Sequence, residues 1–223
     1  MPEQPQHRTA AEYWDTFWPS AGEGSGGVPD ASRMRWTQYP FHGPGAEFLG
    51  RPKTALEIGS ASCVAGVALA RTGVEVTCVD FSSHQMERAR EWWGDEPNVT
   101  LVEADVLAYL DRTDQHWDCV FSNWGAAFFI DPRVLLPLVL PRLRPGGLFA
   151  FAQVEPLAPC FGPQIKYGNG YRGEKLAIVR WMLSNRQWTE TLERHGFVDV
   201  EVVTLPGREP GWVGTTMGRA YAP

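Results

Sequence analysis

The sequence predicts an α/β protein with a doubly wound, mostly parallel sheet, and two neighbouring segments carry this prediction. Residues 54–58 have the pattern of a buried strand that stops at a glycine, turns through small residues and enters an apolar helix at 61–72. Residues 74–79 have the pattern of a second buried strand, and Asp80 follows at its tip. A strand, a tight turn, a helix and a second strand ending on an acid form the opening half of a unit that binds a ribose-bearing cofactor.

The same alternation of strands and helices continues along the chain. A long loop is expected over 155–173 because that stretch holds three prolines and four glycines. A helix is expected over 174–194, and the chain then ends in two strands. The remaining expected elements are strands at 99–102, 118–122, 147–154, 198–205 and 212–220, and helices at 82–93, 106–111 and 132–142.

The turn after the first strand indicates the kind of cofactor. A dinucleotide fingerprint needs glycine at its first, third and sixth positions, so that a pyrophosphate can rest on the helix N-terminus. Those positions hold Gly59, Ala61 and Val64, and no Lys-Ser/Thr pair follows to indicate a P-loop. A cofactor with a ribose and a zwitterionic amino acid, but no phosphate, suits this turn better.

Five segments resemble, in this order, the motifs of class I S-adenosylmethionine-dependent methyltransferases. Two of the three glycines of the first motif are replaced, by Ala61 and Cys63. The resemblance covers about residues 50–205, and the preceding residues look like those of small-molecule tailoring methyltransferases. The five segments are 57–63, Asp80, 102–106, 117–123 and 143–149.

This resemblance implies both a fold and a cofactor. The fold would be a Rossmann-like doubly wound sheet of seven strands with helices on both faces, in which the last two strands form an antiparallel hairpin. An N-terminal helical lid over residues 1–50 would precede a cofactor-binding methyltransferase domain over 51–223. The cofactor would be S-adenosyl-L-methionine.

The expected cofactor residues follow from the motif positions. By resemblance, Glu57 would organise the turn around the amino acid end of the cofactor, and Asp105 would contact the adenine amine. Asp80 would accept hydrogen bonds from the ribose hydroxyls. Asp105 has the alternative of capping a short helix, and Asn123 that of stabilising a turn. The full set is Glu57, Gly59, Ser60, Ala61, Asp80, Phe81, Ser82, Asp105, Val106, Ser122 and Asn123.

Aromatic residues are unusually frequent, with ten tryptophans in 223 residues. Four of the aromatic side chains precede the sheet, in the region that covers the cofactor in similar enzymes, and the faces of such rings attract a sulfonium. The stretch 20–30 is rich in Gly, Ser and Pro and would serve as a flexible connector. Simple packing on the sheet edge is the alternative. The expected substrate and lid residues are Trp14, Trp18, Trp36, Tyr39 and Trp124.

Two residues are candidates for proton removal. Glu155 follows the fifth strand, where acceptors bind in this fold, and His42 lies in an aromatic loop before the sheet. A structural role is the alternative for a single loop histidine. No strong catalytic motif is expected, because a sulfonium is already a good leaving group and the protein need only align the acceptor and exclude water.

Composition limits the kinds of binding partner and the cellular compartment that we expect for this protein. The net charge is −6 with no block of Lys or Arg, which argues against a nucleic-acid partner. No signal peptide or membrane-spanning stretch is visible, and four unpaired cysteines indicate a cytoplasmic protein. No clustered metal ligands appear, so no metal is expected. The protein would be a monomer or homodimer.

The expected function is methyl transfer from S-adenosyl-L-methionine to a small, largely apolar or aromatic molecule. Two alternatives stay open. One is a carboxyl or peptide methyltransferase, and the other is a cofactor-binding member of the fold that does not transfer methyl.

Overall fold

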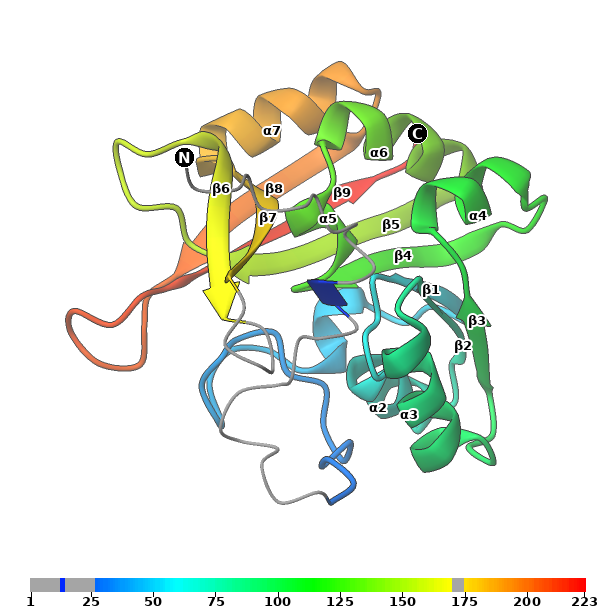
Figure 1. Ribbon diagram of the computed structural model, residues 1–223. Helices are drawn as coiled ribbons and strands as arrows, with labels where there is room; N and C mark the ends of the chain where they lie inside the picture. Colours follow the sequence, from blue (N-terminus) through cyan, green and yellow to red (C-terminus); the bar gives the residue numbers. More distant parts are fainter. Residues whose placement is uncertain (1–12, 15–26, 170–174) are drawn as a thin grey trace, which may run out of the picture.

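A seven-stranded sheet forms the centre of the computed structural model, which describes residues 13–14, 27–169 and 175–223 (Figure 1). The strand order is β3-β2-β1-β4-β5-β9-β8. The first five strands pair in parallel, and β9 pairs antiparallel with both β5 and β8. The strands are β1 Thr54–Ile58, β2 Glu75–Asp80, β3 Val99–Glu103, β4 Trp117–Asn123, β5 Leu143–Val154, β8 Val198–Leu205 and β9 Thr215–Tyr221. The doubly wound, seven-stranded prediction is confirmed.

Helices cover both faces of this sheet, as predicted (Figure 1). Side chains of successive strand residues point to opposite faces, so that Ala55 joins the core under α2 and α3 while Leu56 joins the core under α4, α6 and α7. The helices are η1 Ala46–Leu49, α2 Val64–Ala70, α3 Ser83–Trp93, α4 Val106–Arg112, α5 Ala126–Phe129, α6 Pro132–Val139, η2 Leu140–Arg142 and α7 Asn185–Arg194.

Helix starts follow capping side chains. The Ser82 hydroxyl accepts the N–H of Gln85 at 3.2 Å, and α3 begins there. Asp105 accepts the N–H of Ala108 at 2.9 Å and starts α4. Such caps satisfy backbone donors that a helix leaves unpaired at its first turn. Both starts therefore lie directly after a strand end, which brings the capping residues to the carboxyl edge of the sheet.

The region between β5 and α7 differs from the sequence prediction. The expected loop over 155–173 contains β6 Gly162–Asn169, and the expected helix over 174–194 begins with β7 Lys175–Met182 instead. These two strands pair into a separate antiparallel sheet. The composition of β7 suits a helix locally, but pairing with β6 overrides that preference. The helix α7 begins only after Ser184, which forms a capping box with Gln187.

The segment before β1 is anchored in the core. Trp36 is fully buried, its ring packs edge-on against Phe48 and Phe121, and its indole N–H donates to the Gly45 carbonyl at 3.0 Å. Over residues 27–49 the only helix is the short η1. Residues 13–14 are helical, and residues 1–12 and 15–26 of the predicted helical lid, including Trp18, lie outside the described residues.

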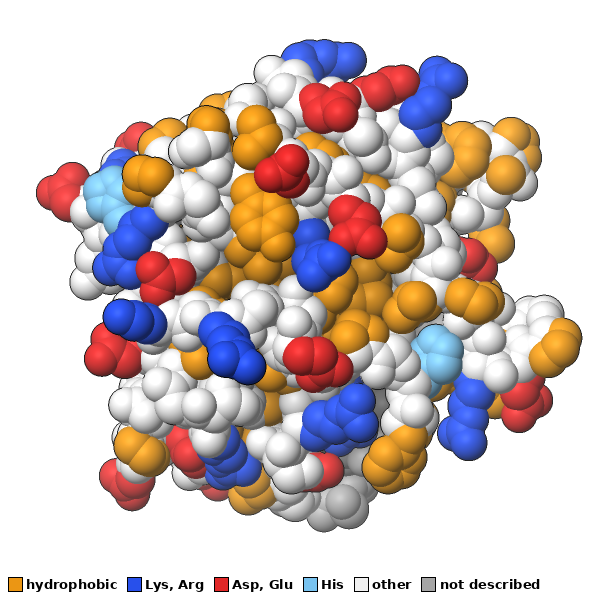
Figure 2. Space-filling view, turned by 180° about the vertical axis from the view of Figure 1, so that it is seen from behind, with side chains coloured by type: hydrophobic (Ala, Val, Ile, Leu, Met, Phe, Trp, Pro, Cys, Tyr) orange, Lys and Arg blue, Asp and Glu red, His pale blue; other side chains and the backbone are white. Residues whose placement is uncertain are grey.

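The surface carries charges of both signs. On the face seen in Figure 2, Lys and Arg side chains alternate with Asp and Glu, and apolar patches show between them. Among the described residues, no helix is long and apolar enough to cross a membrane.

Candidate functional site

A cavity opens at the carboxyl ends of β1, β2, β3 and β4. It encloses about 90 Å³ and its walls are largely apolar, with two carboxylates, Asp80 and Asp105, among them. Ligands of doubly wound sheets bind at this edge. The lining residues are Trp14, Gly59, Ala61, Asp80, Phe81, Gln85, Asp105, Val106, Trp124, Gly125, Ala126, Phe129 and Ile130. Eight residues predicted from the sequence therefore come together here.

The turn after β1 depends on left-handed backbone conformations. Gly59 has φ 70°, and a Cβ there would collide with the backbone nitrogen of Ala126. Ala61 and Cys63 have φ 46° and 62°, so the positions where the family motif has glycine do adopt the conformation that favours glycine. Small residues at these positions thus form a turn in which the Gly59 backbone lies against the start of α5.

Asp80 links the turn after β1 to the start of α3 at the cavity. One carboxylate oxygen accepts the N–H of Ala61 at 2.8 Å and the other accepts the N–H of Ser82 at 2.9 Å. The side chain lies at the rim of the cavity and is 8% exposed. A carboxylate oxygen has two lone pairs, so Asp80 retains acceptor capacity for hydroxyl groups in the cavity.

Glu57 lies behind the turn instead of lining the cavity. It is buried, and it accepts hydrogen bonds from the Gly66 backbone N–H and from the Cys78 thiol at 3.6 Å. Burial raises the pKa of the Glu57 carboxyl to about 8, against the opposing effect of these hydrogen bonds. A Cβ at Gly66 would collide with Cys78 and Glu57, so glycine lets α2 approach the carboxyl closely.

Asp105 has the capping role weighed for it, and its contact with the adenine amine stays a prediction. It caps α4 and also lines the cavity, together with Val106. Gln85 was missed by sequence reasoning, although it is 5% exposed and lines the same cavity. The available signal was its position three residues after the Ser82 cap, because the first turn of a helix that follows a strand end faces the carboxyl edge of the sheet.

Two aromatic rings, Trp14 and Phe129, cover one side of the cavity and are called its roof below. Trp14 meets Phe129 edge-on with 4.8 Å between ring centroids, and Tyr13 packs beside them with Ile178 of β7. Trp124 has φ 57°, and its indole N–H donates to the Trp36 carbonyl at 2.8 Å. The apolar run 126–130 supplies Phe129 and Ile130, which sequence reasoning did not select. Trp14 and Trp124 thus stand where the aromatic cover was predicted.

Four residues that were predicted to bind the cofactor make polar contacts within the protein instead of lining the cavity. The Ser122 hydroxyl accepts the N–H of Ala127 at 2.9 Å, at the start of α5. The Ser60 hydroxyl lies 3.3 Å from the Cys63 sulfur, and Ser82 caps α3. The Asn123 amide donates to the Arg35 carbonyl at 2.7 Å. None of these four lines the cavity, and Trp36 lies in the core.

The two candidate bases and Tyr39 lie outside the cavity lining. The His42 ring nitrogen is 3.2 Å from the Thr37 hydroxyl, and Tyr39 donates to the Val213 carbonyl at 2.6 Å. Glu155 accepts the N–H of Gly214 at 2.7 Å. The Tyr39 contact holds the loop between β8 and β9 against the segment before β1, and the Glu155 contact joins the same loop to the end of β5.

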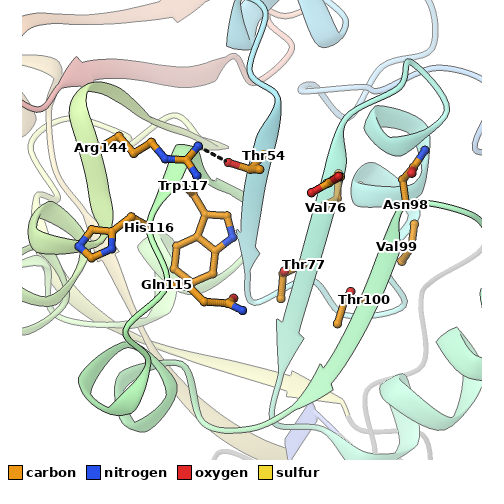
Figure 3. Close-up of a pocket in the computed structure, with 11 residues that line it drawn as sticks. Thr54, Val76, Thr77, Asn98, Val99, Thr100, Gln115, His116, Trp117 and Arg144 are labelled. Carbon is orange, nitrogen blue, oxygen red and sulfur yellow. Dashed lines mark hydrogen bonds between the residues drawn. The ribbon is translucent and has the colours of Figure 1, made fainter.

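A second, larger cavity lies at the opposite edge of the sheet (Figure 3). It encloses about 650 Å³ among polar side chains at the amino ends of β1, β2 and β3. Arg144 borders it and is held by the Thr54 hydroxyl at 3.0 Å and by Asp118 at 2.6 Å. None of the predicted site residues lines it. We place the candidate site at the smaller cavity, because position at the carboxyl edge is the stronger criterion than volume. In the described part of the chain, no cluster of three His, Cys, Asp or Glu is arranged to hold a metal.

This chain is similar to several known proteins. Residues 55–147 match the family described as a methyltransferase domain. A 152-residue stretch is 29% identical to carboxy-S-adenosyl-L-methionine synthase of Aeromonas salmonicida, covering 62% of this chain and 60% of that protein. A 92-residue stretch is 30% identical to demethylmenaquinone methyltransferase of Clavibacter sepedonicus, covering 41% of this chain and 37% of that protein. The glycopeptide N-methyltransferase MtfA complexed with S-adenosyl-L-methionine superposes with a TM-score of 0.61 at 19% identity, over 82% of this chain and 96% of that chain.

The chain therefore contains a region similar to a methyltransferase domain, over residues 55–147, and shares its fold with the glycopeptide N-methyltransferase MtfA. It spans about 60% and 37% of the length of the two curated relatives, and the likeness to MtfA shows a shared fold.

Restoring glycine at position 63 is expected to leave the cofactor dissociation constant within about twofold. The left-handed backbone of Cys63 strains a side-chain-bearing residue by about 1 kcal/mol, and relief of that strain offsets the loss of a small buried side chain. Isothermal titration with S-adenosylhomocysteine and a thermal melt measure the two effects. Cys119→Gly is the matched control, because Cys119 is equally buried on β4 and the removal of its side chain relieves no such strain. A folded Cys63→Gly protein with lost affinity would show that the thiol itself contributes to binding.

Proposed function

We propose that the protein transfers the methyl group of S-adenosyl-L-methionine to a small, largely apolar or aromatic acceptor. The observation that carries this proposal is the cavity at the carboxyl edge, where Asp80 and Asp105 face a wall of aromatic rings. The matched methyltransferase domain, which spans residues 55–147, contains both carboxylates and the turn after β1.

On this proposal, the two carboxylates set the orientation of the cofactor in the cavity. Asp80 would accept the ribose hydroxyls and Asp105 the adenine amine, beside Phe81 and Val106. The amino acid end would then lie along the turn that begins at Gly59, over the buried Glu57. The sulfonium would come close to Trp14 and Trp124, whose ring faces favour a positive charge.

In the proposed reaction, an acceptor lone pair forms a bond to the methyl carbon as the bond from that carbon to sulfur breaks. The bonding electron pair stays on sulfur, which becomes the neutral sulfur of S-adenosylhomocysteine. An acceptor that carries a proton releases it to solvent or to a base. Alignment and exclusion of water are the contributions of the protein, and the apolar walls of the cavity suit both.

His42 and Glu155 stay candidates for the base from their sequence positions alone. Each has a partner in the structure, Thr37 for His42 and the Gly214 backbone for Glu155. We infer that both hold loops near the acceptor, and that proton removal falls to the acceptor's own acidity or to solvent.

A second candidate function is chemistry on the cofactor itself, without methylation of an acceptor. The likeness to carboxy-S-adenosyl-L-methionine synthase favours it, because that relative is named for a product derived from the cofactor. Mass spectrometry of reactions with S-adenosyl-L-methionine separates the two functions. Methyl transfer yields S-adenosylhomocysteine and a product 14 Da heavier than the acceptor, whereas the second function yields a modified cofactor.

Removing the Asp80 carboxylate is expected to weaken S-adenosyl-L-methionine binding by about 1.5–3 kcal/mol, which is about 10- to 150-fold in the dissociation constant. Asp80→Ala loses the charged acceptor of the ribose hydroxyls, and isothermal titration measures the effect. Asp118→Ala is the matched control, because Asp118 also accepts backbone N–H groups, at 2.8 and 3.0 Å, but at the opposite end of the sheet. An unchanged dissociation constant for Asp80→Ala, or an equal loss in both variants, would contradict the assignment.

A further inference from the structure

The β6–β7 hairpin lies beside the candidate site. Its strand β7 packs against α5, the short helix that supplies Phe129 to the cavity (Figure 1). Ile178 of β7 is buried in the cluster that contains Tyr13, with Trp14 and Phe129 packed around it. One face of this hairpin therefore borders the aromatic roof of the cavity.

Arg180 is on that same face of β7, two residues after Ile178. Alternation along a strand places Ile178, Arg180 and Met182 on one side, and Ile178 and Met182 are buried. The guanidinium Nη2 donates to the Gln164 side chain at 3.3 Å, while its Nε is buried and has no hydrogen-bond partner. None of the carboxylates in the described residues pairs with it. A partly buried guanidinium without a counter-charge is costly, so a protein retains one where a ligand supplies the charge.

Gln153 has an unpaired acceptor atom, and it is hydrogen-bonded to the residue that follows this arginine. It is fully buried near the end of β5, and its amide nitrogen donates to the carbonyl of Trp181, the residue after Arg180, at 3.1 Å. Its oxygen Oε1 is buried and has no partner. An unpaired donor and an unpaired acceptor thus belong to two residues that the Gln153–Trp181 hydrogen bond brings to the same junction of β5 and β7.

We propose that Arg180 and Gln153 form the polar end of the acceptor site, and that the acceptor is an aromatic carboxylic acid with a hydroxyl or amino group next to its carboxylate. The carboxylate would accept the hydrogen bond of Arg180 Nε, and the neighbouring O–H or N–H would donate to Gln153 Oε1. The ring would extend toward Ile178 and Phe129 of the roof. This inference rests on the proposed function, because it assumes that the cavity beneath the roof holds the cofactor.

A structural explanation predicts a different result. A single ordered water bridging Arg180 Nε and Gln153 Oε1 would satisfy both atoms without any ligand. In that case, replacing Arg180 would change the melting temperature and leave the binding of small acids unaffected.

Titration of the full-length protein saturated with S-adenosylhomocysteine tests the proposal. The probes are salicylate, which carries a ring, a carboxylate and an adjacent hydroxyl, and salicylamide, its neutral counterpart. We expect salicylate to bind about tenfold more tightly than salicylamide, because a charge-assisted hydrogen bond to Arg180 distinguishes them. Arg180→Gln should abolish this preference and Arg180→Lys should retain part of it. Arg186→Gln, at an exposed arginine of α7, should leave it unchanged.

Each remaining outcome overturns the proposal. These are equal binding of the two probes, no binding of salicylate, or a preference that survives Arg180→Gln. The S-adenosylhomocysteine titration that precedes the probe titration isolates the proposed function. If S-adenosylhomocysteine does not bind, the proposed function fails, whereas binding of S-adenosylhomocysteine without a salicylate preference refutes only the acidic acceptor.

Discussion

Replacing Trp36 by alanine is expected to lower the free energy of unfolding by about 3–5 kcal/mol. The side chain is fully buried between Phe48 and Phe121, so its removal leaves a large cavity in the core beneath α2. It also leaves the Gly45 carbonyl without its 3.0 Å hydrogen bond. Urea denaturation followed by circular dichroism measures the change in free energy.

Trp212→Ala provides the control for this prediction. Trp212 is 48% exposed and stacks on Tyr39 in the loop between β8 and β9, so its removal is expected to cost less than about 1 kcal/mol. If the two variants lose similar stability, residues 27–49 are a detachable cover and not part of the core. The large expected loss at Trp36 would show that residues 27–49 are part of the folded core.

Replacing Glu57 by glutamine is expected to remove a pH-dependent destabilisation of about 4–5 kcal/mol. Folding raises the pKa of this carboxyl from 4.5 to about 8 because the group is buried. The folded protein therefore holds a proton that the unfolded chain releases between these pH values. As pH rises from about 4.5 to 8, Glu57 causes the free energy of unfolding to fall, and Glu57→Gln lacks this contribution.

Denaturation of both proteins at pH 5 and pH 8.5 measures this difference. The wild-type protein should lose more stability over this range than Glu57→Gln, with the two closest at pH 5. Glu75→Gln, at an exposed carboxyl of β2, should follow the wild-type curve. A Glu57→Gln protein whose stability changes in parallel with the wild type would show that the buried carboxyl does not retain its proton.

The parallel strands and the helices between them were predictable because the sequence patterns that indicate them are local and recur along the chain. Each of β1, β2 and β4 is a short apolar run, and helices α3 and α4 begin at capping residues that the sequence displays. The hairpin β6–β7 was not predictable in this way. Its strands are stabilised mainly by each other, and neither has a pattern that distinguishes it from a loop or a helix.

The candidate site was predictable where chemistry coincides with a strand end. Asp80 ends β2, Asp105 follows β3, and both line the cavity. Ser122 and Asn123 also end a strand, but their side chains point to backbone partners behind the wall. Phe129 comes from a helix position whose direction depends on how the helix packs, which the sequence alone does not reveal.

The small volume of the cavity has a kinetic consequence. Sites for ligands of cofactor size commonly enclose about 300–1,000 Å³, whereas this cavity encloses about 90 Å³ beneath Trp14 and Phe129. On the proposed function, S-adenosyl-L-methionine therefore enters only after this roof has opened. The observed association rate would then rise with cofactor concentration only to a plateau set by the opening step. Departure of S-adenosylhomocysteine requires the same opening, so turnover cannot be faster than the opening step.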